Sequence, residues 1–142
     1  MNMSREIYTP AGGPPPVNPD IRKVYDSAGE EALRELVDMF YEEIKTSSII
    51  SMFPENLEES KKKAADFLIQ VMGGPQYYTH NYQPPRMRSQ HLPFEIDEKA
   101  RRAWLGCYKK ALAKSGISDK DKGIIWDYLE VFSTWMVNKK GD

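Results

Sequence analysis

The chain has 142 residues, with 20 basic and 21 acidic side chains and a formal net charge of −1. This length favours one domain that can bury a core and one cofactor. The balanced charge excludes the basic surface that nucleic-acid binding requires. A single cysteine cannot form an intrachain disulfide, which fits a reducing compartment. Because no apolar run has signal-peptide or membrane-span length, we expect a cytoplasmic protein that does not enter a membrane.

The chain is predicted to divide into a flexible arm, residues 1–18, and a folded domain, residues 19–140. Glycines and prolines at 11–16 cannot continue a helix or a central strand. Asn18 is a suitable N-cap and Pro19 a suitable first residue for a short helix that ends near Ser27. Gly29 then allows a tight turn.

Residues 30–46 predict the first long helix, because apolar residues recur there at spacings of three and four. This apolar stripe consists of Leu33, Leu36, Val37, Phe40, Tyr41 and Ile44. Because Tyr41 lies on this stripe, its hydroxyl is expected in the interior, where it needs a hydrogen-bond partner. That partner is either a backbone group or a bound ligand. A short connector over residues 47–54 follows.

The second long helix is expected over residues 57–72 and ends at the Gly73-Gly74-Pro75 run. Its inward residues should be Leu57, Ala64, Phe67, Leu68 and Val71. The run of three lysines from Lys61 is interpreted as a solvated face. Residues 75–85 are polar and proline-rich, which predicts a loop without regular structure.

The remaining chain predicts three further helices. A short one over residues 86–90 carries His91 and is ended by Pro93. Long helices are expected over residues 97–115 and 118–138, the second starting at a sequence that resembles a capping box. No stretch alternates with period two, so the fold class is all-α, with the first two long helices crossing over the last two.

Four sequence features, in this order and at these spacings, resemble a truncated haemoglobin of group II. They are the Phe40-Tyr41 pair, Gly73-Gly74-Pro75 with Tyr78, His91 within Arg86–Phe94, and Ala103-Trp104-Leu105 before Cys107. The resemblance covers about residues 20–139. It implies a two-over-two helical sandwich that encloses haem b, iron protoporphyrin IX.

On the proximal side, the resemblance implies that His91 ligates the haem iron. Nearby apolar residues would cover the porphyrin face: Met87, Leu92, Phe94 and Ile96. The other histidine, His80, lies in the polar loop, where the family places no ligand. The alternative for His91 is a histidine in an ordinary surface turn.

On the distal side, Tyr41 matches the family's distal tyrosine and Trp104 the tryptophan that marks group II. Both would donate hydrogen bonds to a bound dioxygen, each worth about 1 to 3 kcal/mol if it is charge-assisted. The alternatives are a core tyrosine bonded to backbone and a tryptophan that only packs.

The resemblance also implies which residues line the distal pocket. Phe53 matches the aromatic residue against the porphyrin edge and lacks the hydroxyl that some relatives have. Ser60 aligns with the family's gate position and Ala64 with the inward position one turn later. Neither ligates iron well, so we expect a roomy pocket, completed by Phe67 and Leu68, and an open sixth position on the iron.

The resemblance implies Tyr78 and Arg88 as hydrogen-bond donors to the haem propionates. The family often has arginine directly before the proximal histidine, whereas this chain has Gln90, which removes one possible ion pair. Lys62 or Lys63 could replace it. Cys107 is interpreted as a buried thiol.

Two classes of function follow from the resemblance. The first is a haem protein that binds dioxygen, nitric oxide or carbon monoxide, as a monomer or homodimer. The second is a haem enzyme, a peroxide reductase or nitric-oxide dioxygenase, that needs an external reductase. Two distal donors slow ligand escape, which argues against rapid oxygen transport and favours ligand chemistry.

Overall fold

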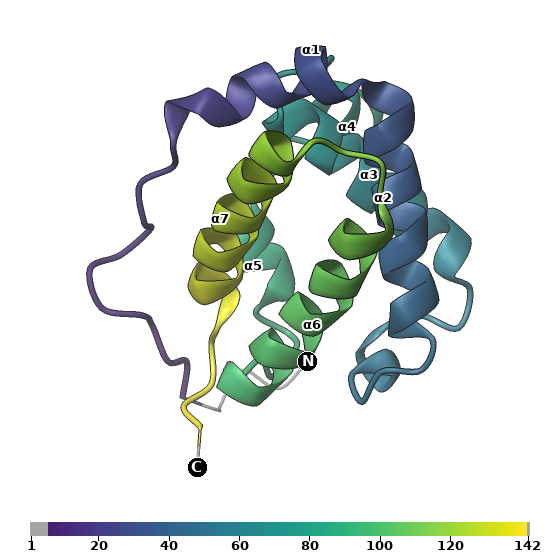
Figure 1. Cartoon of the computed structure of the whole chain (residues 1–142). Helices are drawn as coiled ribbons and strands as arrows, with labels where there is room; N and C mark the ends of the chain where they lie inside the picture. The colour runs from purple at the N-terminus through teal and green to yellow at the C-terminus, as the bar shows by residue number, and fades with distance from the viewer. Residues whose placement is uncertain (1–5, 142) are drawn as a thin grey trace.

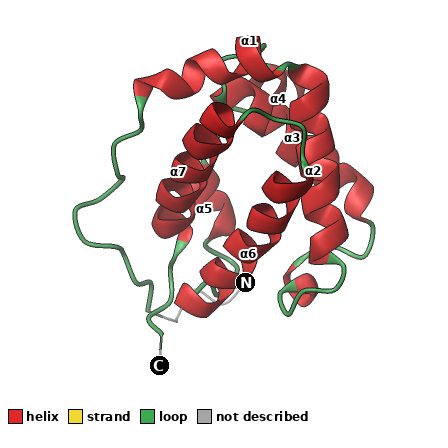
Figure 2. Cartoon of the chain, viewed as in Figure 1, coloured by secondary structure: helices red, strands yellow, loops and turns green. Residues whose placement is uncertain are grey.

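The computed structural model describes residues 6–141, and this part of the chain is helical with no strand (Figure 2). Its helices are η1 (Pro19–Lys23), α1 (Val24–Ala28), α2 (Glu30–Ile44), η2 (Ile50–Met52), α3 (Leu57–Val71), α4 (Tyr77–Asn81), α5 (Met87–His91), α6 (Glu98–Lys114) and α7 (Asp119–Met136). The predicted all-α fold class is confirmed. No helix within residues 6–141 is both long and apolar enough to cross a bilayer.

Four long helices pack in the predicted two-over-two arrangement. Helix α2 packs against both α3 and α6, and α6 also packs against α7. The short helix α5 lies beside α7 (Figure 1). The N-terminal segment runs outside α7 and approaches the C-terminal segment, where Tyr8 N donates to Asn138 O over 2.9 Å (Figure 1). Residues 1–5 of the predicted flexible arm lie outside the described residues.

Side-chain caps start the helices where the sequence places polar residues. Asn18 Oδ1 accepts from Asp20 N over 2.9 Å, and Pro19 follows it as the first helical residue. Ser118 Oγ accepts from Asp121 N over 3.2 Å at the start of α7. The capping box is only half formed, because the Asp121 carboxylate accepts from the Ser27 hydroxyl over 2.6 Å and so ties α7 to α1.

The prediction of a structureless loop over residues 75–85 is wrong, because residues 77–81 form α4. Gln70 explains this helix by making two hydrogen bonds to Thr79: its Nε2 donates to Oγ1 over 2.7 Å, and its Oε1 accepts from Thr79 N over 3.0 Å. The preceding turn needs glycine. Gly73 has φ +96°, and a Cβ there would lie 1.9 Å from Arg22 O. Tertiary contacts therefore override the polar composition.

Helix α3 packs through two faces rather than the single one expected. One packs into the core through Ala65, Asp66, Leu68 and Ile69. The other faces a cavity, so Ala64 and Phe67 are only half-buried. The burial of Asp66, which was not expected for a carboxylate, follows from polar partners on α2 and near α4.

Candidate functional site

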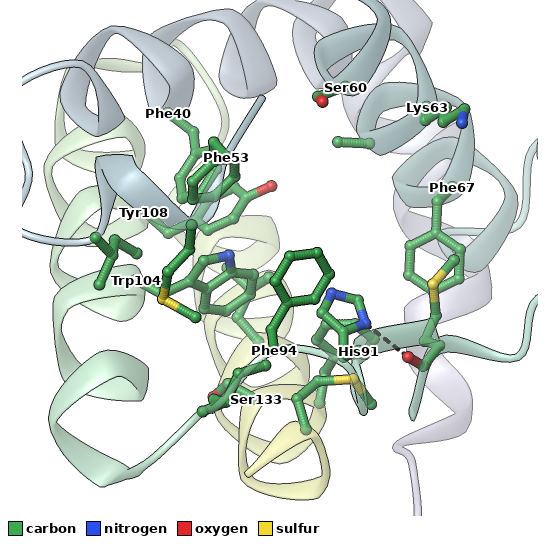
Figure 3. Close-up of a pocket in the computed structure, with 18 of the residues that line it drawn as sticks. Phe40, Phe53, Ser60, Lys63, Phe67, His91, Phe94, Trp104, Tyr108 and Ser133 are labelled. Atoms are coloured by element: carbon green, nitrogen blue, oxygen red, sulfur yellow. Dashed lines mark hydrogen bonds between the residues drawn. The ribbon is translucent and has the colours of Figure 1, made fainter. Parts of the chain in front are cut away.

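A cavity of about 420 Å³ lies between α2, α3, α5, α6 and α7. Its size is that of a small-molecule or cofactor site. Its wall is mainly apolar and includes many aromatic rings, several of which are labelled in Figure 3. Of the residues predicted for the haem site, Leu92 and Arg88 do not line the cavity. Those that do are Tyr41, Phe53, Ser60, Ala64, Phe67, Leu68, Tyr78, Met87, His91, Phe94, Ile96 and Trp104.

His91 is the last residue of α5 and the histidine that lines the cavity. Its Nδ1 lies 2.6 Å from Met87 O (Figure 3). A carbonyl oxygen only accepts hydrogen bonds, so Nδ1 carries the proton and Nε2 keeps its lone pair. Burial lowers the pKa of His91, although the bond to Met87 opposes this. A neutral imidazole with one nitrogen tied to a carbonyl is the donor that a haem iron requires.

Tyr41 on α2 has an exposed fraction of 4% and packs edge-on against Phe53, with ring centroids 5.8 Å apart. Among residues 6–141 the structure gives its hydroxyl no hydrogen-bond partner. Burial raises the pKa of Tyr41 to about 12, which keeps the hydroxyl protonated at neutral pH. The backbone partner considered above is therefore absent among the described residues.

Trp104 on α6 is half-buried and lines the same cavity. Its ring packs against Phe40 at 5.8 Å, Tyr108 at 4.9 Å and Phe132 at 6.0 Å between centroids. Figure 3 shows the Trp104 indole and the His91 imidazole directed toward a common space, with the Phe94 ring beside them. Phe94 is 45% exposed and stands at the edge of the cavity.

Further wall residues were not predicted as part of the site. Phe40 stacks on Tyr108 with ring centroids 3.9 Å apart, and both rings line the cavity together with Tyr128. Burial raises the pKa of Tyr108 and of Tyr128. The available signal was helical spacing: Tyr108 lies one turn after Trp104, on the same face of α6.

The Tyr78 hydroxyl donates to Gln90 Oε1 over 3.0 Å, and both side chains line the cavity. Gln90 Nε2 is buried and has no hydrogen-bond partner within residues 6–141. A buried donor without a partner is costly, and a water, an ion or a bound group at the cavity would satisfy it. Lys63 also lines the cavity and lies 3.7 Å from Glu59, whereas Lys62 does not line it.

Arg88 is placed differently from the prediction. Residues 87, 90 and 91 share the face of α5 that meets the cavity, and residue 88 points away from it. Its guanidinium stacks over Trp135 at 4.5 Å and donates to Val137 O over 2.9 Å. Arg88 therefore does not line the cavity. Cys107 is buried outside the cavity lining, and burial raises the pKa of its thiol.

Comparison with known proteins agrees with this architecture. Residues 23–138 match the family described as Bacterial-like globin. The "Group 2 truncated hemoglobin YjbI" of Bacillus subtilis is 37% identical over 116 residues, which cover 81% of this chain and 88% of that protein. The phosphate-bound Hell's gate globin IV structure has a TM-score of 0.85 and 40% identity, covering 90% of this chain and 82% of that one.

A third similar structure is the "truncated oxygen-avid haemoglobin from Bacillus subtilis", with a TM-score of 0.78 and 37% identity, covering 81% of this chain and 98% of that one. Helical topology, a cavity with many aromatic rings and a half-buried histidine on a short helix are the attributes of a small globin. The chain belongs to the bacterial-like globin family and, within it, to the group II truncated haemoglobins.

Proposed function

We propose that this chain binds haem b through His91 and holds dioxygen or another diatomic ligand with Tyr41 and Trp104. The observation that carries the proposal is the 2.6 Å contact between His91 Nδ1 and Met87 O. The hydrogen bond from Nδ1 to Met87 O leaves the Nε2 lone pair available, and His91 lines the cavity. Haem iron, when bound, supplies one coordination position for this histidine and another for a small ligand.

Tyr41 and Trp104 act on the ligand rather than on the haem. Bound dioxygen carries partial negative charge, which a hydroxyl and an indole N–H stabilise in a dry pocket. The Tyr41 hydroxyl is already desolvated and has no partner within residues 6–141, so it breaks no protein hydrogen bond when it donates. Such donors lower the rate of ligand escape.

The sixth coordination position of a bound haem would stay open, because α3 offers it no strong ligand. Ser60 and Ala64 line the cavity, and neither side chain competes well for iron. Ala64 is small, which leaves space beside Phe67 for a diatomic molecule or a water. We therefore propose a five-coordinate resting site.

The haem propionates would meet neutral as well as charged donors. Gln90 Nε2 is a buried donor that lacks a partner, and Tyr78 orients the same side chain. Lys63 supplies a cationic group at the cavity edge. These residues replace Arg88, whose guanidinium is engaged elsewhere.

A second candidate is a haem enzyme that reduces peroxide or converts nitric oxide, with electrons from an external reductase. The two donors that hold dioxygen would also polarise a peroxide O–O bond. The term "oxygen-avid" applied to the similar Bacillus subtilis structure fits slow dioxygen release and leaves either role open. Turnover that is lost in both Tyr41→Phe and Trp104→Phe would establish the enzyme.

The decisive experiment is an absorption spectrum of the purified, haem-reconstituted protein beside His91→Ala. We expect a Soret band with distinct ferrous dioxygen and carbon monoxide forms, and loss or gross alteration of these forms in the variant. Wild-type protein that takes up no haem would overturn the proposal. Exposed His80, changed to Ala, is the matched control and should leave the spectrum unaltered.

A further inference from the structure

The segment after α7 makes an unexpected contact with the proximal histidine. Asn138 is polar and has an exposed fraction of 0%, yet it does not line the cavity. Its Nδ2 donates to His91 O over 3.2 Å, and its Oδ1 accepts from Ile96 N over 3.1 Å. One amide group thus bridges both ends of the 91–96 turn, and both ends line the cavity.

The backbone reinforces this bridge. Asn138 N and Lys139 N both donate to Ile96 O, over 2.9 and 3.0 Å, and Phe94 N donates to His91 O over 3.0 Å. These contacts matter because α5 has only five residues and ends at His91. A helix this short is unstable alone, and its last carbonyls lack intrahelical partners. The position of His91 therefore depends on groups outside α5.

Arg88 ties the same segments together from the other face of α5. Its guanidinium donates to the backbone oxygens of Trp135 and Val137 at the end of α7, and to Tyr8 O over 2.9 Å in the N-terminal arm. Tyr8 N in turn donates to Asn138 O over 2.9 Å. We name this connected set, Tyr8, Arg88 and Asn138, the proximal clamp.

We propose that Asn138 is a positioning residue for His91, and that the proximal clamp sets the strain and strength of the bond between His91 and iron. The inference rests on the proposed function, because it takes His91 as the iron ligand. The hydrogen bond from Asn138 to His91 O fixes the backbone from which the imidazole extends. Both ends of the chain thus act on the iron site without lining the cavity.

The test uses the full-length, haem-reconstituted protein in its ferrous, ligand-free form. The iron–histidine stretching band is recorded by resonance Raman spectroscopy for wild type, Asn138→Ala and Arg88→Ala. Lys139→Ala is the matched control, because its exposed side chain leaves the backbone bond to Ile96 in place. Haem loss to an excess of a haem-accepting apoprotein is measured in parallel. Arg88→Ala probes the clamp independently if Asn138→Ala fails to fold.

We expect the stretching band to shift in both clamp variants and not in Lys139→Ala. Haem loss should accelerate about tenfold in Asn138→Ala, as is typical when a group that orients a metal ligand is removed. A lower unfolding temperature with an unchanged band would overturn the proposal, because Asn138 would then only stabilise the fold. A wild-type protein without any iron–histidine band would instead overturn His91 ligation, and with it the proposed function.

Discussion

Tyr78 and Gln90 lie on different short helices, α4 and α5, and are joined by a hydrogen bond of 3.0 Å from the Tyr78 hydroxyl to Gln90 Oε1. This bond fixes which end of the amide is free, so that Gln90 Nε2 remains a buried donor at the cavity. The resemblance to group II truncated haemoglobins implies arginine at this position. In the proposed haem site, Gln90 would therefore offer a propionate a neutral donor, oriented by a tyrosine, in place of a charged one.

Gln90→Leu should therefore weaken haem retention. A hydrogen bond to a charged group contributes about 1.5 to 3 kcal/mol, so haem loss should accelerate at least tenfold. Tyr78→Phe should produce a smaller acceleration, because Gln90 keeps its donor but loses its orientation. Transfer of haem to an acceptor apoprotein, followed by absorbance, measures both. Exposed Lys62→Ala is the control, and equal rates in Gln90→Leu and wild type would contradict the assignment.

Tyr41→Phe should release dioxygen faster. Loss of one charge-assisted donor costs about 1 to 3 kcal/mol, which corresponds to roughly a 5- to 150-fold higher dissociation rate. Carbon monoxide accumulates less charge and should respond less. Stopped-flow displacement of dioxygen by carbon monoxide gives the rate. Tyr25→Phe is the control. It removes a tyrosine hydroxyl that donates to Glu30 outside the cavity, and it should leave the dioxygen dissociation rate unchanged. An unaltered Tyr41→Phe rate would remove Tyr41 from the ligand site.

Periodicity predicted the long helices and much of the cavity wall. Tyr41, Phe40 and Tyr108 fall on apolar stripes, so their burial follows from spacing alone. His91 and Trp104 required the resemblance to a family, because a single histidine or tryptophan carries no periodic signal. Composition alone does not place Phe94, whose ring is 45% exposed and lies at the edge of the cavity.

Long-range hydrogen bonds were not predictable from the sequence. Arg88 was expected at the haem edge, but its direction depends on the backbone oxygens that α7 presents to it. Asn138 bonds His91 and Ile96 from 47 and 42 residues away in the chain. Asp66 is buried because Arg34 and Asn81 happen to meet it. Each of these contacts is set by packing rather than by local pattern.

Alkaline pH should destabilise the fold through its buried tyrosines. Burial raises the pKa of Tyr41 from 10.0 to about 12, so between these values the unfolded chain loses a proton that the folded chain keeps. The stabilising contribution is complete below pH 10 and is lost as the pH rises toward 12, by up to about 1.4 kcal/mol per pH unit per group. Tyr108 and Tyr128 act in the same direction.

Urea unfolding of wild type and Tyr41→Phe at several pH values from 8 to about 11.5 checks this expectation. Wild type should lose unfolding free energy above pH 10, and the variant should lose it less steeply. Parallel curves for the two proteins would show that Tyr41 ionises equally in both states.

Asp66 has an exposed fraction of 2% and accepts hydrogen bonds from Arg34 Nη2, Asn81 Nδ2 and the Tyr82 hydroxyl, over 3.1, 3.3 and 3.4 Å. These bonds join α2, α3 and the end of α4. Asp66→Ala should lower the unfolding free energy by about 2 to 3 kcal/mol, since it leaves several polar groups without their acceptor. Part of the cost is relieved because the Arg34 side chain is 37% exposed and can be hydrated.

The matched control is Asp38→Ala, which removes a carboxylate that is 60% exposed and lies 3.6 Å from Lys61 Nζ. A surface pair of this kind contributes about 0.5 kcal/mol. Urea unfolding of the two variants at pH 7 should therefore separate them clearly. Equal losses would mean that the buried carboxylate stabilises the protein no more than a surface one. Haem uptake by Asp66→Ala should persist, because Asp66 does not line the cavity. Of the α4 residues, Tyr78 is the one that lines it.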